Sequence, residues 1–269
     1  IGLSLDGPKE INDSFRIDYS MNGSFNKIMS TAKILNDHQV DFNILTIITK
    51  SLANQIDSIY HFLKENNFKY LQFIPCLDPL DSANKEYSLS SEDYGYFLKT
   101  LFDLWYNDLI NDEHISVRFL DNVLRMYLGQ QPESCDMIGR CSIQHVIEAN
   151  GEVYPCDFYV LDGYSIGNIN TNTIDELHST ETAQQFINES LGINSSCEQC
   201  DWKRLCRGGC KRHLDTSSIN QFCSSYKDFY KYAHKRFIRL ANLIIKNNKK
   251  MKNKKMKYLF VTTLSSLMM

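Results

Sequence analysis

The sequence predicts an α/β protein with a parallel sheet, followed by a cysteine-rich region and a final helix. Apolar runs rich in β-branched residues alternate with segments of helical periodicity, in the order strand, helix, strand, helix, strand. Eight of the nine cysteines then fall between Cys135 and Cys223. Helical patterns become sparse after Gly129. We therefore expect a sheet domain over residues 1–129 and a cysteine-rich domain over residues 130–245.

The sheet domain is expected to begin with a short strand. Residues 1–6 are mostly apolar and end at the turn signal Gly7-Pro8. A helix is expected over residues 25–35, with Ser24 as its N-cap, and a buried strand over residues 40–49. A helix over residues 56–66 then leads to a third strand at residues 70–75. Functional groups of parallel α/β folds gather at the carboxyl ends of strands, which here are Ser4 to Asp6, residues 46–49 and residues 75–77.

The remaining elements are helical or very short. Residues 90–110 have an amphipathic pattern, with Ser91 as the expected cap. Short strands are expected at residues 145–149 and 152–155, and a helix over residues 222–245 closes the cysteine-rich domain. Residues 246–269 are rich in lysine and end in an apolar run. Because that run is too short to span a membrane, we favour a disordered tail over a basic anchor on a membrane surface.

Composition and charge are ordinary for a globular protein and argue against two classes of partner. The chain is 43% hydrophobic and 23% charged, with a formal net charge of −3. Seven lysines and no acidic residue lie beyond residue 245, which leaves residues 1–245 with a formal charge of −10. An acidic body argues against nucleic acid as a partner, and no apolar run reaches membrane-spanning length. Dense cysteines without a visible secretory signal favour the reducing cytoplasm, where thiols serve metal or redox chemistry.

The cysteines are spaced for two sites of four thiolates each. The first block reads C-x9-G-x4-C from Cys141 to Cys156, with Cys135 just upstream, and the second reads C-x2-C-x5-C-x3-C-x12-C and ends at Cys223. Zinc and iron–sulfur clusters both commonly take four thiolates. A zinc ribbon usually presents two C-x2-C pairs, and only the start of the second block has that form. The irregular spacings favour iron–sulfur clusters, and structural zinc remains the alternative.

The two blocks resemble the SPASM cluster-binding domain of radical SAM enzymes. The segments GLSLDGPKEI, YLQFIPCLDPL, GEVYPCDFYVLDGY and CEQCDWKRLCRGGCKR narrow the resemblance to the anaerobic sulfatase-maturating enzymes, over about residues 1–245. The resemblance implies the C-terminal part of a partial (β/α)6 radical SAM barrel, followed by a SPASM domain and a C-terminal helix. It also implies oxidation of a cysteine or serine in a sulfatase to formylglycine, with cleavage of S-adenosylmethionine to form the radical.

The resemblance also assigns the cysteines to two auxiliary 4Fe-4S clusters. One would be held by Cys135, Cys141, Cys156 and Cys210, and the other by Cys197, Cys200, Cys206 and Cys223. Asp157, directly after Cys156, would remove a proton from the substrate residue while a nearby oxidant takes the second electron. Without the resemblance, Asp157 reads as a carboxylate that accepts backbone N–H bonds in its loop.

Three further positions resemble contacts of the family with S-adenosylmethionine. Ser4 and Arg16 match residues that meet its amino-acid part, where a guanidinium can pair with the carboxylate. Leu77 matches a residue that packs on the adenine. The alternatives are a plain turn for Ser4, a solvated charge for Arg16 and ordinary core for Leu77. Cys76, the ninth cysteine, is expected to be a buried free thiol.

One motif of the family does not occur in these 269 residues. The radical-generating cluster of the family needs a C-x3-C-x2-C motif followed by a Gly-Gly-Glu segment. The chain also opens at Ile1 inside a strand-like run, so we expect it to be truncated and inactive by itself. The implied partners are a sulfatase polypeptide with a Cys/Ser-x-Pro/Ala-x-Arg motif and an electron donor such as ferredoxin or flavodoxin. The rivals are another SPASM enzyme that modifies a different peptide, and a zinc-binding interaction module without redox chemistry.

Overall fold

The computed structural model describes residues 1–79, 85–192 and 194–253. The first half contains β1 (Gly2–Ser4), α1 (Lys9–Phe15), α2 (Phe25–Asp37), β2 (Asn43–Ile48), α3 (Lys50–Ala53), α4 (Ile56–Glu65), β3 (Tyr70–Pro75), α5 (Ser91–Ile110), β4 (Ser116–Val117) and α6 (Arg118–Tyr127). The second half contains α7 (Cys135–Ile138), β5 (Val146–Ile147), β6 (Glu152–Tyr154), η1 (Asp157–Tyr159), η2 (Asp162–Tyr164), β7 (Gly167–Asn168), α8 (Ile174–Ser179), α9 (Glu181–Glu189), η3 (Ser195–Cys197), α10 (Lys203–Cys206), η4 (Lys211–His213) and α11 (Cys223–Asn253), where η marks a 3-10 helix.

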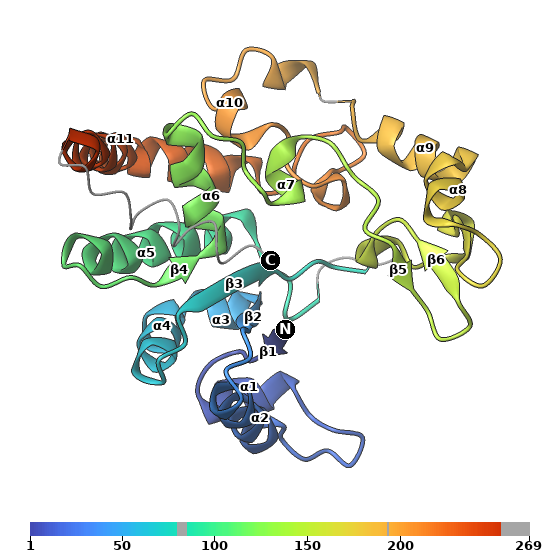
Figure 1. Cartoon of the computed structure of the whole chain (residues 1–269), viewed down its shortest axis with the longest axis horizontal. Helices are drawn as coiled ribbons and strands as arrows, with labels where there is room; N and C mark the ends of the chain where they lie inside the picture. Colours follow the sequence, from blue (N-terminus) through green and yellow to red (C-terminus); the bar gives the residue numbers. More distant parts are fainter. Residues whose placement is uncertain (80–84, 193, 254–269) are drawn as a thin grey trace.

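The first four strands form a parallel sheet in the order β1-β2-β3-β4 (Figure 1). Parallel neighbours need crossover connections, which α1 and α2, α3 and α4, and α5 supply in turn. Along β2 the buried side chains alternate, so that Ile44, Thr46 and Ile48 lie on the buried face of the sheet. The predicted strands at residues 40–49 and 70–75 are present, and the α/β prediction is confirmed.

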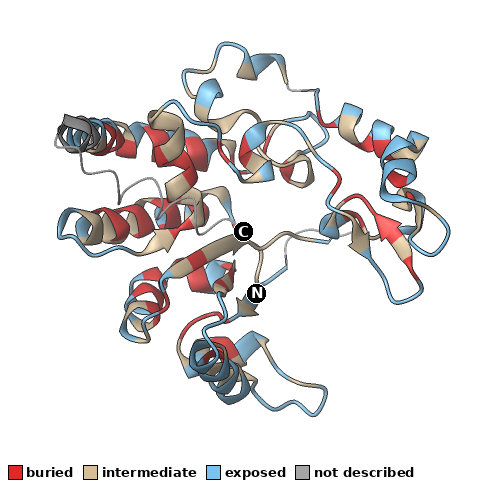
Figure 2. Ribbon diagram, viewed as in Figure 1, coloured by how far each residue is buried: buried red, intermediate tan, exposed pale blue. Residues whose placement is uncertain are grey.

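The larger hydrophobic core joins this sheet to α5, α6 and α11. Phe102, Phe229 and Phe237 are completely buried there, and the ring centroids of Phe102 and Phe237 lie 4.8 Å apart. Figure 2 shows buried residues on the facing sides of α5 and α11. The final helix therefore completes the core of the first half of the chain, although the sequence analysis grouped it with the cysteine-rich domain.

The region between α6 and α11 has little regular structure. Strands β5, β6 and β7 form a small antiparallel sheet, and α8 and α9 lie beside it (Figure 1). These elements enclose a separate small core, which consists of Ile143, Val153, Tyr159, Ile166, Leu177, Ala183 and Phe186. Most of the cysteine-bearing segments lie in loops and single helical turns between the two cores.

Some helix ends differ from the sequence prediction. Ser90, not Ser91, caps α5, since its Oγ accepts the backbone N–H of Asp93 at 3.0 Å. The hydroxyl of Ser24 precedes α2 as expected but donates to a backbone carbonyl instead of capping the helix. Helix α11 continues to Asn253, past the expected end at residue 245, and residues 254–269 of the expected tail lie outside the described residues. No helix in the described part of the chain is long and apolar enough to cross a membrane.

Candidate metal centre

Four cysteines from three separate parts of the sequence line one pocket. Its walls include Cys135, Cys141, Cys156 and Cys210 together with Lys211, around an empty space of about 440 Å³ that is partly open to solvent. The thiol of Cys210 interacts electrostatically with those of Cys135 and Cys141, and the thiol of Cys156 with that of Cys210. These four cysteines, called the first group below, are the set that the resemblance assigns to one cluster.

The other four cysteines of the region form a second group. Cys197 ends η3, Cys206 ends α10 and Cys223 begins α11. The thiol of Cys206 interacts electrostatically with those of Cys197, Cys200 and Cys223. Cys223 likewise interacts with Cys197 and Cys200. Each of these thiols thus interacts with other thiols of its own group of four.

The chemistry of both groups fits iron–sulfur clusters. All nine cysteines are free thiols. Burial raises the pKa of Cys156 and Cys210 to about 12 and that of Cys206 to about 11, so these thiolates need a positively charged partner. Among the described residues, no three His, Cys, Asp or Glu side chains converge closely enough to hold a single metal ion. An all-sulfur donor set of four per group is the set that a four-iron cluster requires.

Asp157 lies beside the first group, at an exposed position. Its Oδ1 accepts the backbone N–H of Phe158 at 3.1 Å and the thiol of Cys156 at 3.2 Å. The backbone contact is the loop-stabilising role that the sequence alone suggested. The contact with Cys156 also puts the carboxylate beside the first group, at a position exposed to solvent.

Lys211 covers one side of the first group. Its Nζ lies 2.7 Å from a carboxylate oxygen of Glu189 and 4.4 Å from the ring centroid of Phe186. The rings of Tyr159 and Tyr164 lie 5.2 and 5.7 Å from the same ammonium group. These contacts fasten the turn after Cys210 to the small core. The sequence analysis did not single out Lys211, and its place directly after a cysteine was the only signal.

Arg16 is held at the carboxyl end of β1 by Asp6. Its Nε and Nη2 donate to the two carboxylate oxygens of Asp6 at 2.6 and 3.1 Å. The backbone N–H of Ile47 donates to the same carboxylate at 2.9 Å, and Asp6 is 4% exposed. Ser4 is the last residue of β1 itself, and its side chain is exposed. One edge of the guanidinium is therefore occupied, and its other edge carries the remaining N–H donors.

The residues after β3 lie close to these strand ends. Leu77 is half-buried and packs against the larger core. Cys76 is half-buried, and burial raises the pKa of its thiol, with the carboxylates of Asp78 and Asp6 contributing. The guanidinium of Arg212 donates to the backbone carbonyl of Asp78 at 2.5 Å. The carboxyl end of the sheet is thereby attached to the turn that follows Cys210.

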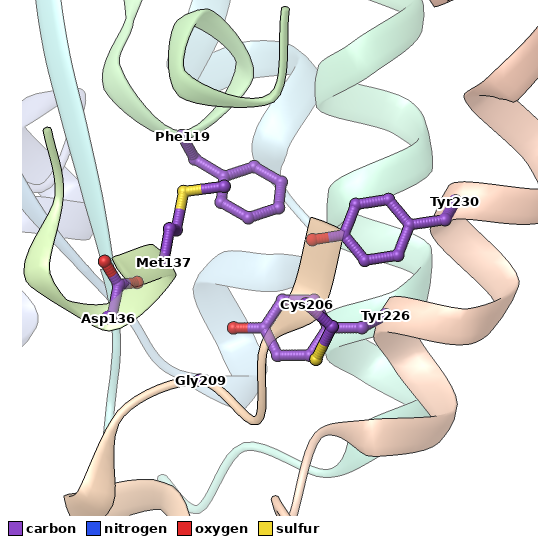
Figure 3. Close-up of a pocket in the computed structure, with 7 residues that line it drawn as sticks. All are labelled: Phe119, Asp136, Met137, Cys206, Gly209, Tyr226 and Tyr230. Carbon is purple, nitrogen blue, oxygen red and sulfur yellow. The ribbon is translucent and has the colours of Figure 1, made fainter. Parts of the chain in front are cut away.

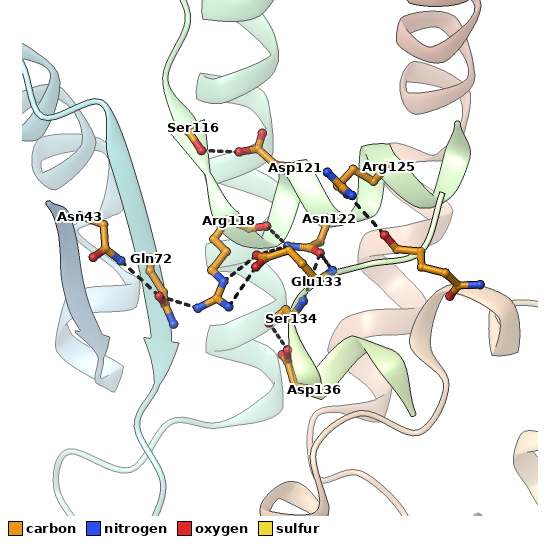
Figure 4. Close-up of polar contacts among 11 residues, drawn as sticks. Asn43, Gln72, Ser116, Arg118, Asp121, Asn122, Arg125, Glu133, Ser134 and Asp136 are labelled. Carbon is orange, nitrogen blue, oxygen red and sulfur yellow. Dashed lines mark hydrogen bonds and ion pairs between the residues drawn. The ribbon is translucent and has the colours of Figure 1, made fainter. Parts of the chain in front are cut away.

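A polar network joins the sheet to the loop that carries Cys135 (Figure 4). Arg118 donates from Nη1 to Gln72 of β3 at 2.9 Å and from Nε to Glu133 at 2.8 Å. The buried side chain of Asn122 accepts the backbone N–H of Glu133 at 2.6 Å and donates to its carboxylate at 3.1 Å. The network fixes the position of the segment just before Cys135. No sequence motif marks these residues, so sequence reasoning missed them.

A small cavity, partly open to solvent, lies between the segment that follows Cys135 and Cys206 of the second group (Figure 3). Asp136, the neighbour of Cys135, lines one side, and Cys206 with Tyr226 and Tyr230 of α11 lines the other, around an empty space of about 200 Å³. Burial holds the pKa of both tyrosines well above the usual range, so their hydroxyls stay protonated. Helix α11 therefore contacts the cysteine-rich region as well as the larger core.

Comparison with known proteins agrees with this geometry. Residues 135–201 match the SPASM model, an iron–sulfur cluster-binding domain. The cysteine-type anaerobic sulfatase-maturating enzymes of Clostridium novyi (strain NT) and Clostridium perfringens (strain 13 / Type A) are 46% and 43% identical, over 86% and 91% of this chain and 63% and 68% of their own lengths.

A solved structure gives the same result. Native anSMEcpe with bound AdoMet and Kp18Cys peptide matches with a TM-score of 0.86 and 43% identity, covering 90% of this chain and 68% of that chain. The chain thus spans about two thirds of the length of the curated relatives that it matches. On this evidence it belongs to the family of anaerobic sulfatase-maturating enzymes.

Proposed function

We propose that this chain supplies the auxiliary-cluster part of an enzyme that oxidises a cysteine of a sulfatase polypeptide to formylglycine. The observation that carries the proposal is the first group, in which cysteines from three separate parts of the sequence line one pocket beside an exposed carboxylate. The relatives of 46% and 43% identity are named cysteine-type enzymes, which supports cysteine over serine as the substrate residue. The solved relative contains AdoMet and a peptide, which supports the same ligands here.

Two 4Fe-4S clusters are proposed, one in each cysteine group. Cys135, Cys141, Cys156 and Cys210 would hold the first, and Cys197, Cys200, Cys206 and Cys223 the second. When bound, such clusters supply centres that accept or return single electrons. The polar network around Arg118 and Glu133 keeps the first group in a fixed position relative to the sheet.

Asp157 is proposed as the proton acceptor. When the substrate carbon loses a hydrogen atom, its thiol must also lose a proton and one electron before a carbon–sulfur double bond can form. A carboxylate within hydrogen-bond reach of the thiol removes that proton as the electron leaves. Asp157 is exposed and 3.2 Å from Cys156, so proton and electron would leave on the same side of the substrate.

Ser4, Arg16 and Leu77 are proposed to bind S-adenosylmethionine at the carboxyl end of the sheet. Because Asp6 occupies one edge of Arg16, the outer edge would pair with the carboxylate of the methionine part. Leu77 would contact the adenine through the part of its side chain that the core leaves uncovered. Asp6 then acts as the residue that orients the guanidinium, a role that the sequence analysis did not assign.

An acidic electron carrier such as ferredoxin or flavodoxin is the second proposed partner, and neither nucleic acid nor a membrane is expected. Nine free thiols and oxygen-sensitive clusters would suit the reducing cytoplasm.

The division into a domain over residues 1–129, a cluster domain over residues 130–245 and a basic tail stays a prediction. A SPASM enzyme for another peptide is the alternative function, and the match to an iron–sulfur cluster-binding domain argues against a zinc-binding module.

Peptide conversion tests the proposal. The chain alone should not cleave S-adenosylmethionine, whereas a fusion to a segment that carries the C-x3-C-x2-C motif should convert a Cys-x-Pro-x-Arg peptide. In that fusion, Asp157→Asn should lower the formylglycine yield about 100-fold and leave the iron content unchanged. Asp162→Asn is the matched control, because Asp162 is also exposed and also begins a 3-10 helix. Equal yields in the two variants would refute the role of Asp157. If the fusion converted an unrelated peptide but not the Cys-x-Pro-x-Arg peptide, the chain would belong to a SPASM enzyme for another peptide.

A further inference from the structure

Charge is divided very unevenly along the chain. Residues 1–194 contain 12 Lys or Arg and 28 Asp or Glu, whereas residues 195–247 contain 11 Lys or Arg and four Asp or Glu. The second range includes every cysteine of the second group. A basic segment is thus attached to an acidic body, and the proposed function makes no use of it.

Part of this positive charge is exposed and unneutralised. Six side chains, called the basic face below, are exposed on α10 and α11: Lys203, Arg204, Lys227, Lys231, Lys235 and Arg239. None of the six forms an ion pair with any residue in the described ranges. The four on α11 follow one another at intervals of four residues, so they form one ridge along the helix. The acidic residues nearby in sequence are Glu198, Asp201 and Asp228, also exposed.

The basic face lies next to the second group of cysteines. Cys206 is the last residue of α10, and Cys223 is the first residue of α11, one turn before Lys227. The ring of Trp202, at the start of α10, lies 5.3 Å from that of His234 on α11. This contact holds the two basic helices together.

We propose that the basic face docks a negatively charged electron-carrier protein beside the second group. The inference rests on the proposed function, in which an electron carrier serves the clusters. In each productive encounter the reduced carrier loses one electron and this protein gains it, and no atoms are transferred. Opposite charges steer such encounters and raise the association rate constant.

The charge distribution favours a compact partner over an extended polyanion. At physiological ionic strength, charges interact over about 8 Å. A small carrier can contact the basic face while it stays beyond that distance from most of the acidic body. A membrane or a DNA duplex would contact a larger part of the chain, and the formal charge of −16 on residues 1–194 would repel it.

The test compares two charge-reversal variants of the anaerobically reconstituted chain. Lys231→Glu with Lys235→Glu alters the basic face, and Lys33→Glu with Lys69→Glu changes the net charge by the same amount on exposed residues elsewhere. The affinity for flavodoxin is measured at about 20 mM and about 500 mM salt. At low salt the dissociation constant should rise about tenfold in the first variant and less than about twofold in the second. The difference between the variants should disappear at high salt.

Other outcomes overturn the proposal. Equal weakening in both variants would show that only net charge matters, and absence of flavodoxin binding to the unaltered chain at low salt would remove the docking site. Binding of phosphatidylglycerol vesicles or duplex DNA through the basic face, with flavodoxin unbound, would assign the face to that partner instead. Iron content and dithionite-driven peptide conversion by the fusion described above are measured separately. Loss of iron binding or of peptide conversion would contradict the proposed function. Loss of flavodoxin binding alone would contradict only the docking site.

Discussion

The sheet region and the cysteine-rich region are stabilised in different ways. The larger core extends from β1 to α6 and includes α11, with aromatic rings such as Phe102 and Phe237 in direct contact. Among the described residues, the separate core of the cysteine-rich region contains seven buried apolar side chains, and most of the cysteines of this region are half-buried. Hydrophobic burial can account for the stability of the first region. We expect the second region to need bound clusters to reach comparable stability.

Removal of one ligand should produce the largest effect and should separate the two regions. In the reconstituted chain, Cys210→Ala is expected to reduce iron from about eight to about four per chain, because the first group loses a ligand. Hydrogen exchange in the segments around Cys135, Cys141 and Cys156 should then become fast, while β2 and β3 stay protected. Cys76→Ala is the control, since Cys76 belongs to neither group. Unchanged iron in Cys210→Ala would contradict the grouping of the cysteines.

A change in the larger core should act independently of iron. Phe237 is completely buried, and its replacement by alanine should lower the free energy of unfolding by about 3–5 kcal/mol. Urea unfolding of the sheet region measures this loss, which should be the same before and after reconstitution. Phe15→Ala should cost less than about 0.5 kcal/mol, because Phe15 is 50% exposed. A loss that depends on bound iron would show that α11 belongs to the cysteine-rich region instead.

A smaller effect should follow pH in the sheet region. Burial raises the pKa of Asp121 from 3.8 to about 7, and the hydroxyl of Ser116 donates to its carboxylate at 2.5 Å. Because the folded pKa lies above the unfolded one, this residue weakens folding progressively as the pH rises from about 4 to about 7. Asp121→Asn removes that dependence and can still accept the Ser116 hydrogen bond. The variant should gain stability relative to the unaltered chain between pH 4 and pH 8, and parallel pH curves for the two proteins would contradict this.

The sequence predicted the features that depend on local pattern or on residue chemistry. The strands β2 and β3 were predicted because their runs are almost wholly apolar. The two blocks of cysteines were predicted to be metal ligands because few residue types bind iron or zinc. Helix α6 was missed although Leu120, Val123 and Leu124 recur at helical spacing. Strand β4 has only two residues, which is too short for any periodic signal.

Features that depend on tertiary contacts could not be predicted. The apolar stripe of α11 indicated a helix but not which core the helix would join. Asp6 and Arg16 are ten residues apart, and only the fold shows that their side chains pair. The same holds for the contact of Asn122 with Glu133, which positions the first group without any motif. The residue pattern therefore predicted the chemistry of the ligands, whereas the fold identified the residues that orient them.

The central claim is that residues 135–223 carry two iron–sulfur clusters, on which the stability of the cysteine-rich region depends. Anaerobic reconstitution of the chain with iron and sulfide, followed by metal and sulfide analysis, tests this most directly. We predict about eight irons and about eight sulfides per chain, with broad visible absorbance and slower hydrogen exchange confined to the cysteine-rich region. Two zinc ions per chain, with no colour and no acid-labile sulfide, would contradict the account.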